Sequence, residues 1–315
     1  MRNLALVGDI GGTNARFGLV KLGDIEAHDV EVMKGDDYPT LESAMAHYLE
    51  KRGITQLAAA AVDVAGPVID NAGHLTNRPK WAFTSESLRL AVHAKRFRLL
   101  NDFEALAWSL PHIASSDLVM LGGEIRTKPE VKVVLGPGTG LGMATLAPLP
   151  GGGWMPIAGE GGHVTLPLKT AEELALKDKI MGKDHFAEVE DVLTGSGMLA
   201  LYRAIAERPM AHTPEDVMKA GLAGSDPSAV KTLDHFMTFL MRLAGDMGMA
   251  LQARGGVYLA GGIVPSLVEH LKAPKYRSTF EEKGRLSEVM KQIPLYVITD
   301  PFPAFKGCAA ALNHS

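Results

Sequence analysis

The chain has 315 residues, of which 46% are hydrophobic and 22% are charged, a composition typical of globular proteins and not of disordered ones. Its formal net charge of -4 gives no general attraction to nucleic acid or to an anionic membrane. The single cysteine, Cys308, excludes an internal disulfide framework and any metal site built from several cysteines. At roughly 100 to 200 residues per domain, this length predicts about two domains.

Neither a membrane span nor a secretion signal is predicted. No apolar run reaches the ~18 residues that cross a bilayer. The first apolar run, residues 4–7, is too short for the core of a signal peptide. We therefore expect a cytoplasmic protein that has neither a membrane nor a nucleic acid as a partner.

Short apolar runs followed by turn residues predict β-strands. In chain order they are residues 4–7, 57–65, 97–100, 131–135, 257–260 and 295–298. Helical patterns separate them. Behind a predicted Thr40 cap, apolar residues recur at helical spacing from Leu41 to Leu49, and residues 228–254 are apolar on more than one side, which indicates a long buried helix. This alternation is typical of α/β domains.

Two segments share one layout. Residues 4–7 and 131–135 each predict a strand, each strand enters a glycine-rich turn, and each turn is followed by a second strand, at residues 16–20 and 143–146. A duplication would place one such hairpin at the start of each of two related domains. On this basis we expect residues 1–110 with 301–315 to form a smaller α/β domain and residues 111–300 a larger one. Layout alone leaves open that the two hairpins arose independently.

The first turn, Gly8-Asp9-Ile10-Gly11-Gly12-Thr13, has the chemistry of a phosphate site. Glycines let backbone N–H groups approach phosphate oxygens because no Cβ is in the way, and Thr13 adds a hydroxyl donor. Asp9 is an oxygen ligand suited to Mg²⁺ beside the phosphates. Taken alone, the same residues equally fit an ordinary hairpin turn with a capping aspartate.

Two further glycine turns favour a nucleotide. One is Gly138-Thr139-Gly140 within residues 136–142, and the other is Gly261-Gly262, where a predicted strand gives way to a helix and a flat base or ribose can lie against the backbone. The P-loop pattern, the dinucleotide fingerprint and the Asp-Phe-Gly signature of protein kinases are all absent from the sequence. The phosphate site is therefore of another type.

Asp102 is the candidate catalytic base. The predicted strand at residues 97–100 leads into Asn101 and Asp102, and a helical pattern follows. This position, at the carboxyl end of a strand, is where ligands bind in α/β sheets, although an aspartate there can also serve as a helix cap. A phosphoryl acceptor needs a carboxylate to orient its hydroxyl and take its proton.

A second polar cluster has the groups that bind vicinal hydroxyls. Glu160 and His163 flank two glycines, and Glu190 precedes Leu193-Thr194-Gly195. Carboxylate and imidazole groups accept or donate hydrogen bonds in fixed directions, as a sugar requires. Another polar metabolite remains equally possible on this chemistry. Zinc is disfavoured because no further His or Cys nearby completes a three-ligand set.

Together these motifs resemble the bacterial glucokinase family, within the hexokinase, heat-shock-70 and actin fold group. The resemblance covers nearly the whole chain, from Gly8-Asp9 through Thr76-Asn77 with Trp81, Asn101-Asp102-Phe103, Gly138-Thr139-Gly140-Leu141-Gly142, Glu160-Gly161-Gly162-His163 and Leu193-Thr194-Gly195 to Ala260-Gly261-Gly262. A related group of sugar kinases and repressors has a cysteine-rich zinc motif after the Glu-Gly-Gly-His loop, and the single cysteine excludes it.

The resemblance implies a fold, a reaction and a set of site residues. The fold is two related ribonuclease-H-like domains, as in actin-like ATPases, with a cleft between them that closes over the sugar. The reaction is transfer of the γ-phosphoryl group of ATP to the 6-hydroxyl of glucose, with Mg²⁺ held at Asp9 and with Asp102 as base. A homodimer is implied as well. The implied sugar-binding residues are Asn77, Asn101, Asp102, Glu160, His163 and Glu190. The implied nucleotide-binding residues are Gly8, Asp9, Ile10, Gly11, Gly12, Thr13, Gly138, Thr139, Gly140, Gly261 and Gly262.

Two other functional classes are weighed against a sugar kinase. A mechanical or assembly ATPase on the same fold has no use for the set Glu160, His163 and Glu190. A sugar sensor without activity is expected to lack the base or to carry an added binding domain, and neither is seen. The breadth of hexose specificity, and whether ADP or polyphosphate replaces ATP, stay open.

Overall fold

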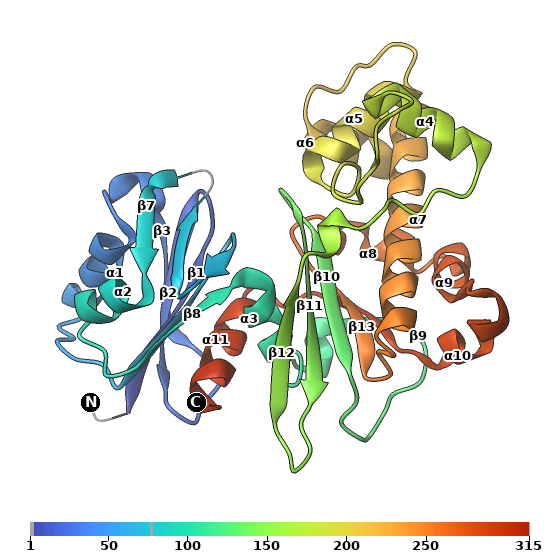
Figure 1. Cartoon of the computed structure of the whole chain (residues 1–315). Helices are drawn as coiled ribbons and strands as arrows, with labels where there is room; N and C mark the ends of the chain where they lie inside the picture. The colour runs from blue at the N-terminus through green and yellow to red at the C-terminus, as the bar shows by residue number, and fades with distance from the viewer. Residues whose placement is uncertain (1–2, 76–77, 315) are drawn as a thin grey trace. The chain divides into compact units, whose positions relative to one another are not determined.

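The computed structural model describes residues 3–75 and 78–314. The chain divides into two compact units. Unit 1 comprises residues 1–114, 149–158 and 300–315, and unit 2 comprises residues 115–148 and 159–299. Figure 1 shows the elements of each unit.

Unit 1 is built on a five-stranded sheet in the order β3-β2-β1-β4-β8. Its strands are β1 (Leu4–Ile10), β2 (Asn14–Lys21), β3 (His28–Lys34), β4 (Ala59–Val64) and β8 (Phe97–Asn101). The first two form the predicted antiparallel hairpin, and β1, β4 and β8 run parallel. A small three-stranded sheet consists of β5 (Val68–Ile69), β6 (Ala72–Leu75) and β7 (Arg78–Thr84).

Helices cover both faces of the five-stranded sheet, because side chains along a strand point alternately to opposite faces. On β4, Ala60 and Val62 join a core with α1 (Leu41–Glu50) and α2 (Ser85–Ala91). Ala59 and Ala61 join a second core with α3 (Asp102–Ser109) and α11 (Pro303–Asn313). The two helices of this second core pack against each other.

Unit 2 repeats the same topology. The second sheet has the order β12-β11-β10-β13-β14-β9. Its strands are β9 (Leu118–Gly122), β10 (Lys132–Pro137), β11 (Leu141–Pro148), β12 (Trp154–Gly159), β13 (Gly256–Leu259) and β14 (Leu295–Ile298). Of β12, residues 154–158 are grouped with unit 1 and Gly159 with unit 2. The pair β10–β11 is antiparallel, as β1–β2 is in unit 1. Strands β10, β13 and β14 run parallel, as β1, β4 and β8 do.

The helices of unit 2 gather around the long helix α7 (Pro227–Ala250), in which Asp226 is the N-cap and a proline occupies the first turn. In Figure 1, helices α4, α5 and α6 lie at one end of α7, and α9 and α10 lie beside its other end. The bounds are α4 (Ala171–Met181), α5 (Gly195–Ile205), α6 (Pro214–Leu222), α8 (Val264–Leu271), α9 (Pro274–Glu281) and α10 (Ser287–Gln292). Short 3₁₀ turns occur at Gly35–Asp37, Ser115–Asp117, Gly161–His163 and Gly284–Leu286.

All six predicted core strands form, and Thr40 caps α1 in a capping box with Ser43. The predicted strand at residues 57–65 is shorter in the structure, Ala59–Val64, because Leu57 makes only an isolated bridge to Ala94. Within residues 3–75 and 78–314, no helix has both the length and the apolar character that a membrane span requires.

Candidate active site

Three acidic side chains lie at one edge of the sheet of unit 1. Asp9 is next to last in β1, Asp63 is next to last in β4, and Asp102 directly follows β8. The parallel register aligns Asp9 with Asp63 and Val64 with Asn101. Carboxyl ends of neighbouring parallel strands meet at the same edge, which is where ligands bind in α/β sheets.

Asn101, and not Asp102, is the N-cap of α3. The Asn101 side-chain oxygen accepts hydrogen bonds from the N–H groups of Phe103 (2.9 Å) and Glu104 (3.4 Å), while its amide donates to the Gly66 carbonyl (3.0 Å). Asp102 therefore occupies the first helical position, and its Oδ1 accepts from the Phe103 N–H at 2.9 Å. The cap and the candidate base are adjacent but separate residues.

The environment of Asp102 suits a proton acceptor. Burial raises the pKa of Asp102 to about 6, the hydrogen bond from the Phe103 N–H acts in the opposite direction, and the nearby charge of Asp9 raises it further. A carboxylate with a pKa of about 6 is still ionised at neutral pH and accepts a proton more readily than an ordinary aspartate. The structure therefore gives Asp102 the properties of a general base.

Asp63 lies beneath these two carboxylates. It is completely buried, its Oδ1 has no hydrogen-bond partner, and its Oδ2 is 3.5 Å from the Cys308 sulfur. The Cys308 thiol also lies 3.6 Å from the Gly8 carbonyl oxygen. Burial raises the pKa of Asp63 well above its usual value, and the charges of Asp9 and Asp102 raise it further. The sequence analysis missed this residue, although it is the only charged residue within residues 57–65.

The first glycine turn is held by its own backbone and by one ion pair. The Gly11 N–H donates to the Asn14 carbonyl at 3.0 Å, and Arg16 Nη1 lies 2.7 Å from Asp9 Oδ2. A Cβ on Gly8 would meet Val62 at 2.9 Å, so packing requires glycine there. The Ile10 side chain is fully buried, which leaves only its backbone for a ligand.

In unit 2 the second and third glycine turns contact each other. A Cβ on Gly136 would lie 2.3 Å from the Ala260 carbonyl oxygen, and one on Gly261, where φ is +85°, would lie 2.5 Å from the Pro137 carbonyl oxygen. No side chain fits at either position. The Gly138 carbonyl in turn accepts from the Gly195 N–H at 3.0 Å, which joins this turn to the start of α5.

Glu190 links the predicted sugar cluster to the second glycine turn. Its Oε2 accepts a hydrogen bond from the Leu141 N–H at 2.7 Å, and its own N–H donates to the Gly162 carbonyl at 2.9 Å. A Cβ on Gly140 would lie 2.8 Å from the same Oε2. The glycines at 140 and 162 therefore allow this carboxylate to lie between the two loops.

His163 has a partner that the sequence analysis missed. Its Nδ1 lies 2.7 Å from Glu188 Oε2, and this hydrogen bond, with the charge of Glu188, raises the pKa of His163. Glu160 is exposed, and it contacts the 3₁₀ turn that follows through its backbone carbonyl, which accepts from the His163 N–H at 3.2 Å, and not through a side-chain cap. The sequence signal that could have revealed Glu188 is that it is a second carboxylate, two residues before Glu190.

The structure divides the predicted residues between the two units. Asn101, Asp102 and the turn at residues 8–13 belong to unit 1, while the remaining described residues of the set belong to unit 2. Asn77 lies outside the described residues. Among residues 3–75 and 78–314, no group of three or more His, Cys, Asp or Glu side chains is arranged to hold a metal ion.

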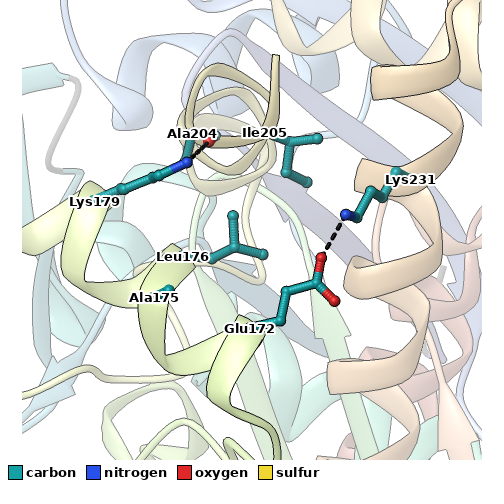
Figure 2. Close-up of a pocket in the computed structure, with 7 residues that line it drawn as sticks. All are labelled: Glu172, Ala175, Leu176, Lys179, Ala204, Ile205 and Lys231. Atoms are coloured by element: carbon teal, nitrogen blue, oxygen red, sulfur yellow. Dashed lines mark hydrogen bonds and ion pairs between the residues drawn. The ribbon is translucent and has the colours of Figure 1, made fainter. Parts of the chain in front are cut away.

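A hollow of about 140 Å³ in the helical part of unit 2 contains none of the predicted residues. Figure 2 shows its lining: Lys231 from α7 pairs with Glu172, and Lys179 from α4 donates to the Ala204 carbonyl. Both ammonium groups that face it are already engaged. None of the residues that line this hollow belongs to the three glycine turns.

Comparison with known proteins assigns the chain to a family. The glucokinase family model matches residues 6–315. A glucokinase from Marinobacter nauticus is 38% identical, over 99% of this chain and 98% of its own length. The chain belongs to the glucokinase family. Another relative, a glucokinase from Campylobacter jejuni subsp. doylei, is 37% identical over 98% of this chain and 94% of its own length.

Solved structures confirm the predicted fold of two related ribonuclease-H-like domains. A glucokinase from an Antarctic psychrotroph superposes with a TM-score of 0.90 at 28% identity, covering 100% of both chains. A ROK-family hexokinase from Thermus thermophilus, at 19% identity and a TM-score of 0.67, covers 98% of both chains and shares the fold. As a member of the glucokinase family, the protein is an ATP-dependent hexose kinase that transfers the γ-phosphoryl group of ATP to the 6-hydroxyl of glucose, the entry step of glycolysis.

Proposed function

We propose that Asp102 is the general base of this glucose phosphorylation. The carboxylate orients the 6-hydroxyl and takes its proton as the oxygen bonds to the γ-phosphorus, and ADP leaves. The observation that supports this role most directly is the position of Asp102, partly buried at the end of β8 with a pKa of about 6. An ordinary exposed aspartate accepts a proton much less readily at neutral pH.

We propose that the remaining site residues bind the sugar, the phosphates or the adenosine. Asn101, Glu160, His163 and Glu190 hold the sugar hydroxyls, and Asn77 is retained as a fifth sugar residue. Backbone N–H groups of the turns at residues 8–13 and 138–140 hold the phosphates, and Gly261 with Gly262 lies against adenosine. Gly138 and Gly262 support this assignment, because a Cβ on Gly262 would meet nothing within 4 Å and one on Gly138 nothing closer than 3.8 Å, which leaves the backbone open to a ligand.

Asp9 is proposed to hold Mg²⁺, directly or through its waters. Mg²⁺ bound to a nucleotide keeps several waters and needs only one or two carboxylates from the protein, so a single aspartate fits. The cation neutralises charge on the phosphates when it is bound. Arg16 pairs with one oxygen of Asp9 and orients that carboxylate. Titration of activity with Mg²⁺ in an Asp9→Asn variant tests this role.

Exchange of Asp102 for asparagine tests the base. Asp102→Asn keeps the shape and a hydrogen bond to the sugar but cannot take the proton, so kcat should fall about 10²- to 10⁴-fold while glucose binding, measured by calorimetry, persists. In the unaltered protein, kcat/KM should decline as the pH falls through about 6, because the base is then protonated. Near-normal turnover of the variant would remove Asp102 from the mechanism.

Substrate range and assembly are further proposals. We expect glucose and ATP to be the preferred pair, and a coupled assay that crosses glucose, mannose and fructose with ATP, ADP and polyphosphate measures the preference. A site that hydrogen-bonds each hydroxyl discriminates strongly against a missing one. We also propose that the protein is a cytoplasmic homodimer. Sedimentation equilibrium tests the dimer, and fractionation of cells tests the location.

A further inference from the structure

A short backbone ladder places His163 diagonally across from Glu188, two residues before the direct partner of Glu188. The Leu166 N–H donates to the Ala187 carbonyl, the Val189 N–H to the Val164 carbonyl, and the Glu190 N–H to the Gly162 carbonyl, each at 2.9 Å. Thr165 and Glu188 form an antiparallel bridge within this ladder. Strand-like pairing of this kind fixes the register between the two segments and therefore which side chains face each other.

The same segment carries two carboxylates, those of Glu188 and Glu190. Glu188 and Glu190 are two residues apart, and they reach different partners, since Glu190 contacts the Leu141 N–H and Glu188 contacts His163. The Glu188 backbone is held as well, because its N–H donates to Asp191 Oδ2 at 2.9 Å. The ladder thus presents one carboxylate to the second glycine turn and one to the imidazole.

The direction of the hydrogen bond determines the state of the ring. An ionised carboxylate only accepts, so at 2.7 Å the Nδ1 of His163 must be the donor to Glu188. Nε2 is then the ring nitrogen that remains for a ligand. Three carboxylates, those of Glu188, Glu190 and Glu160, act on this ring, and all three raise the pKa of His163.

The His163–Glu188 pair contributes little to folding. The two side chains are 55% and 37% exposed, and exposed ion pairs contribute little because water and salt screen them. A contact with little structural value, held in a defined register next to a proposed sugar ligand, is suited to orienting that ligand. The same arrangement, a histidine whose second nitrogen is bound by a carboxylate, orients histidines in other functional sites.

We propose that Glu188 is a positioning residue for His163, fixing the proton on Nδ1 and directing Nε2 to a hydroxyl of the bound sugar. This proposal rests on the proposed function of His163 as a sugar ligand. Glu188 itself does not touch the sugar. Its loss should therefore weaken sugar binding by a smaller factor than loss of His163, and should leave the chemical step nearly unchanged.

The test compares Glu188→Gln with His163→Gln by steady-state kinetics. We expect His163→Gln to raise KM for glucose 10-fold or more and Glu188→Gln to raise it about 3- to 10-fold, with kcat within twofold of the unaltered protein for Glu188→Gln, as expected when binding alone is weakened. The double variant should be no worse than His163→Gln, because the two residues act as one unit. Glu172→Gln is the matched control, since it removes an exposed carboxylate–lysine pair in the same unit (Figure 2) and should leave KM unchanged.

A spectroscopic measurement separates positioning from a general structural effect. ¹⁵N NMR of the histidine ring should show the Nδ1 proton in the unaltered protein, and in Glu188→Gln the pKa of His163 should fall toward its usual value. If His163→Gln leaves KM unchanged, the proposed sugar role of His163 is wrong. If His163→Gln raises KM but Glu188→Gln changes neither KM nor the ring signals, the positioning role alone is overturned.

Discussion

At the scale of single residues, the site of unit 1 combines the proposed base, Asp102, with a buried carboxyl, Asp63, whose pKa is raised well above its usual value. Asp102 and Asp63 are carboxyls at the same sheet edge, but Asp102 accepts a backbone hydrogen bond whereas Asp63 Oδ1 has no partner. An unpaired charge at a fully buried position is costly, and the group responds by staying protonated. Three negative charges at one edge are thereby reduced to two.

Replacement of Asp63 tests this description. The folded-state pKa of Asp63 is raised, so the stability it contributes is fully present below its unfolded pKa of about 3.9 and is lost as the pH rises through the folded value. Asparagine has the shape of aspartate but does not ionise, so Asp63→Asn should avoid this loss of stability. The variant should match the unaltered protein near pH 4 and be more stable at pH 8, by about 1 kcal/mol or more. Urea denaturation at the two pH values, without Mg²⁺, measures the difference.

The control for this prediction is Asp24→Asn, which removes one carboxyl from the exposed surface of the same unit. A stability gain for Asp63→Asn that is equal at pH 4 and pH 8 would mean that Asp63 does not titrate in this range. A loss of stability at pH 8 would mean that Asp63 is ionised and paired in the folded protein.

At the scale of elements, α11 packs closely against α3 and holds it in position. A Cβ on Gly307 of α11 would lie 1.8 Å from the Ala105 carbonyl oxygen of α3, so the two helix backbones pack as closely as a glycine permits. Trp108 of α3 also lies against the His314 ring, with centroids 4.8 Å apart. Because α3 begins at Asp102, the position of the proposed base depends on this helix pair.

Gly307→Ala should therefore impair both stability and activity. The added methyl group has to push the helices apart, and overpacking of this kind costs about 1–3 kcal/mol or more. We expect a melting temperature several degrees lower and a reduced kcat at temperatures where the variant is folded. Gly195→Ala is the control, because a Cβ at this first residue of α5 meets nothing closer than 3.6 Å. Equal melting temperatures for the two variants would contradict the packing.

The same elements indicate how far the sequence alone predicts this fold. Apolar runs and glycine turns gave the core strands of both sheets, and the repeated hairpin predicted the duplicated topology that β1–β2 and β10–β11 display. The contacts between Gly307 and Ala105 and between Cys308 and Asp63 join residues that are more than 200 positions apart. The spacing of apolar residues along the sequence does not reveal such pairs. The apolar run at residues 57–65 therefore predicts an ordinary strand and gives no indication of a special role for Asp63.

The site was predicted unevenly for a similar reason. Residues inside recognisable turns, such as Asp9 and Gly261, were identified because turn chemistry is local. Asn101 was assigned to sugar binding, and the structure adds a second role as the cap of α3. Glu188 was missed because its partnership with His163 depends on the register of a ladder between segments 21 or more residues apart, which sequence patterns leave undetermined.

At the scale of the whole molecule, the proposed sugar ligands come from both units. A ligand that binds only the folded state stabilises it by an amount that grows with its concentration, about 2.7 kcal/mol at 100 times Kd. If both units supply ligands, Asp102→Ala in unit 1 and Glu160→Ala in unit 2 should each reduce the glucose-dependent rise in melting temperature. Differential scanning fluorimetry over a range of glucose concentrations measures it.

Exposed Glu288, which pairs with Lys291 on α10, provides the control variant Glu288→Ala, and its glucose-dependent rise should equal that of the unaltered protein. A full rise in Asp102→Ala together with none in Glu160→Ala would place sugar binding in unit 2 alone. The opposite result would place it in unit 1 alone.

The location of α11 in the chain has a consequence for synthesis. Unit 1 begins at the N-terminal end, but α11, which completes its second core, follows unit 2 in the sequence. Domains usually fold in the order in which they leave the ribosome. Here unit 2 is fully synthesised before α11, so until α11 follows, α3 is the helix that covers this alanine-rich face of the unit 1 sheet. The nascent enzyme therefore acquires the support for its catalytic helix last.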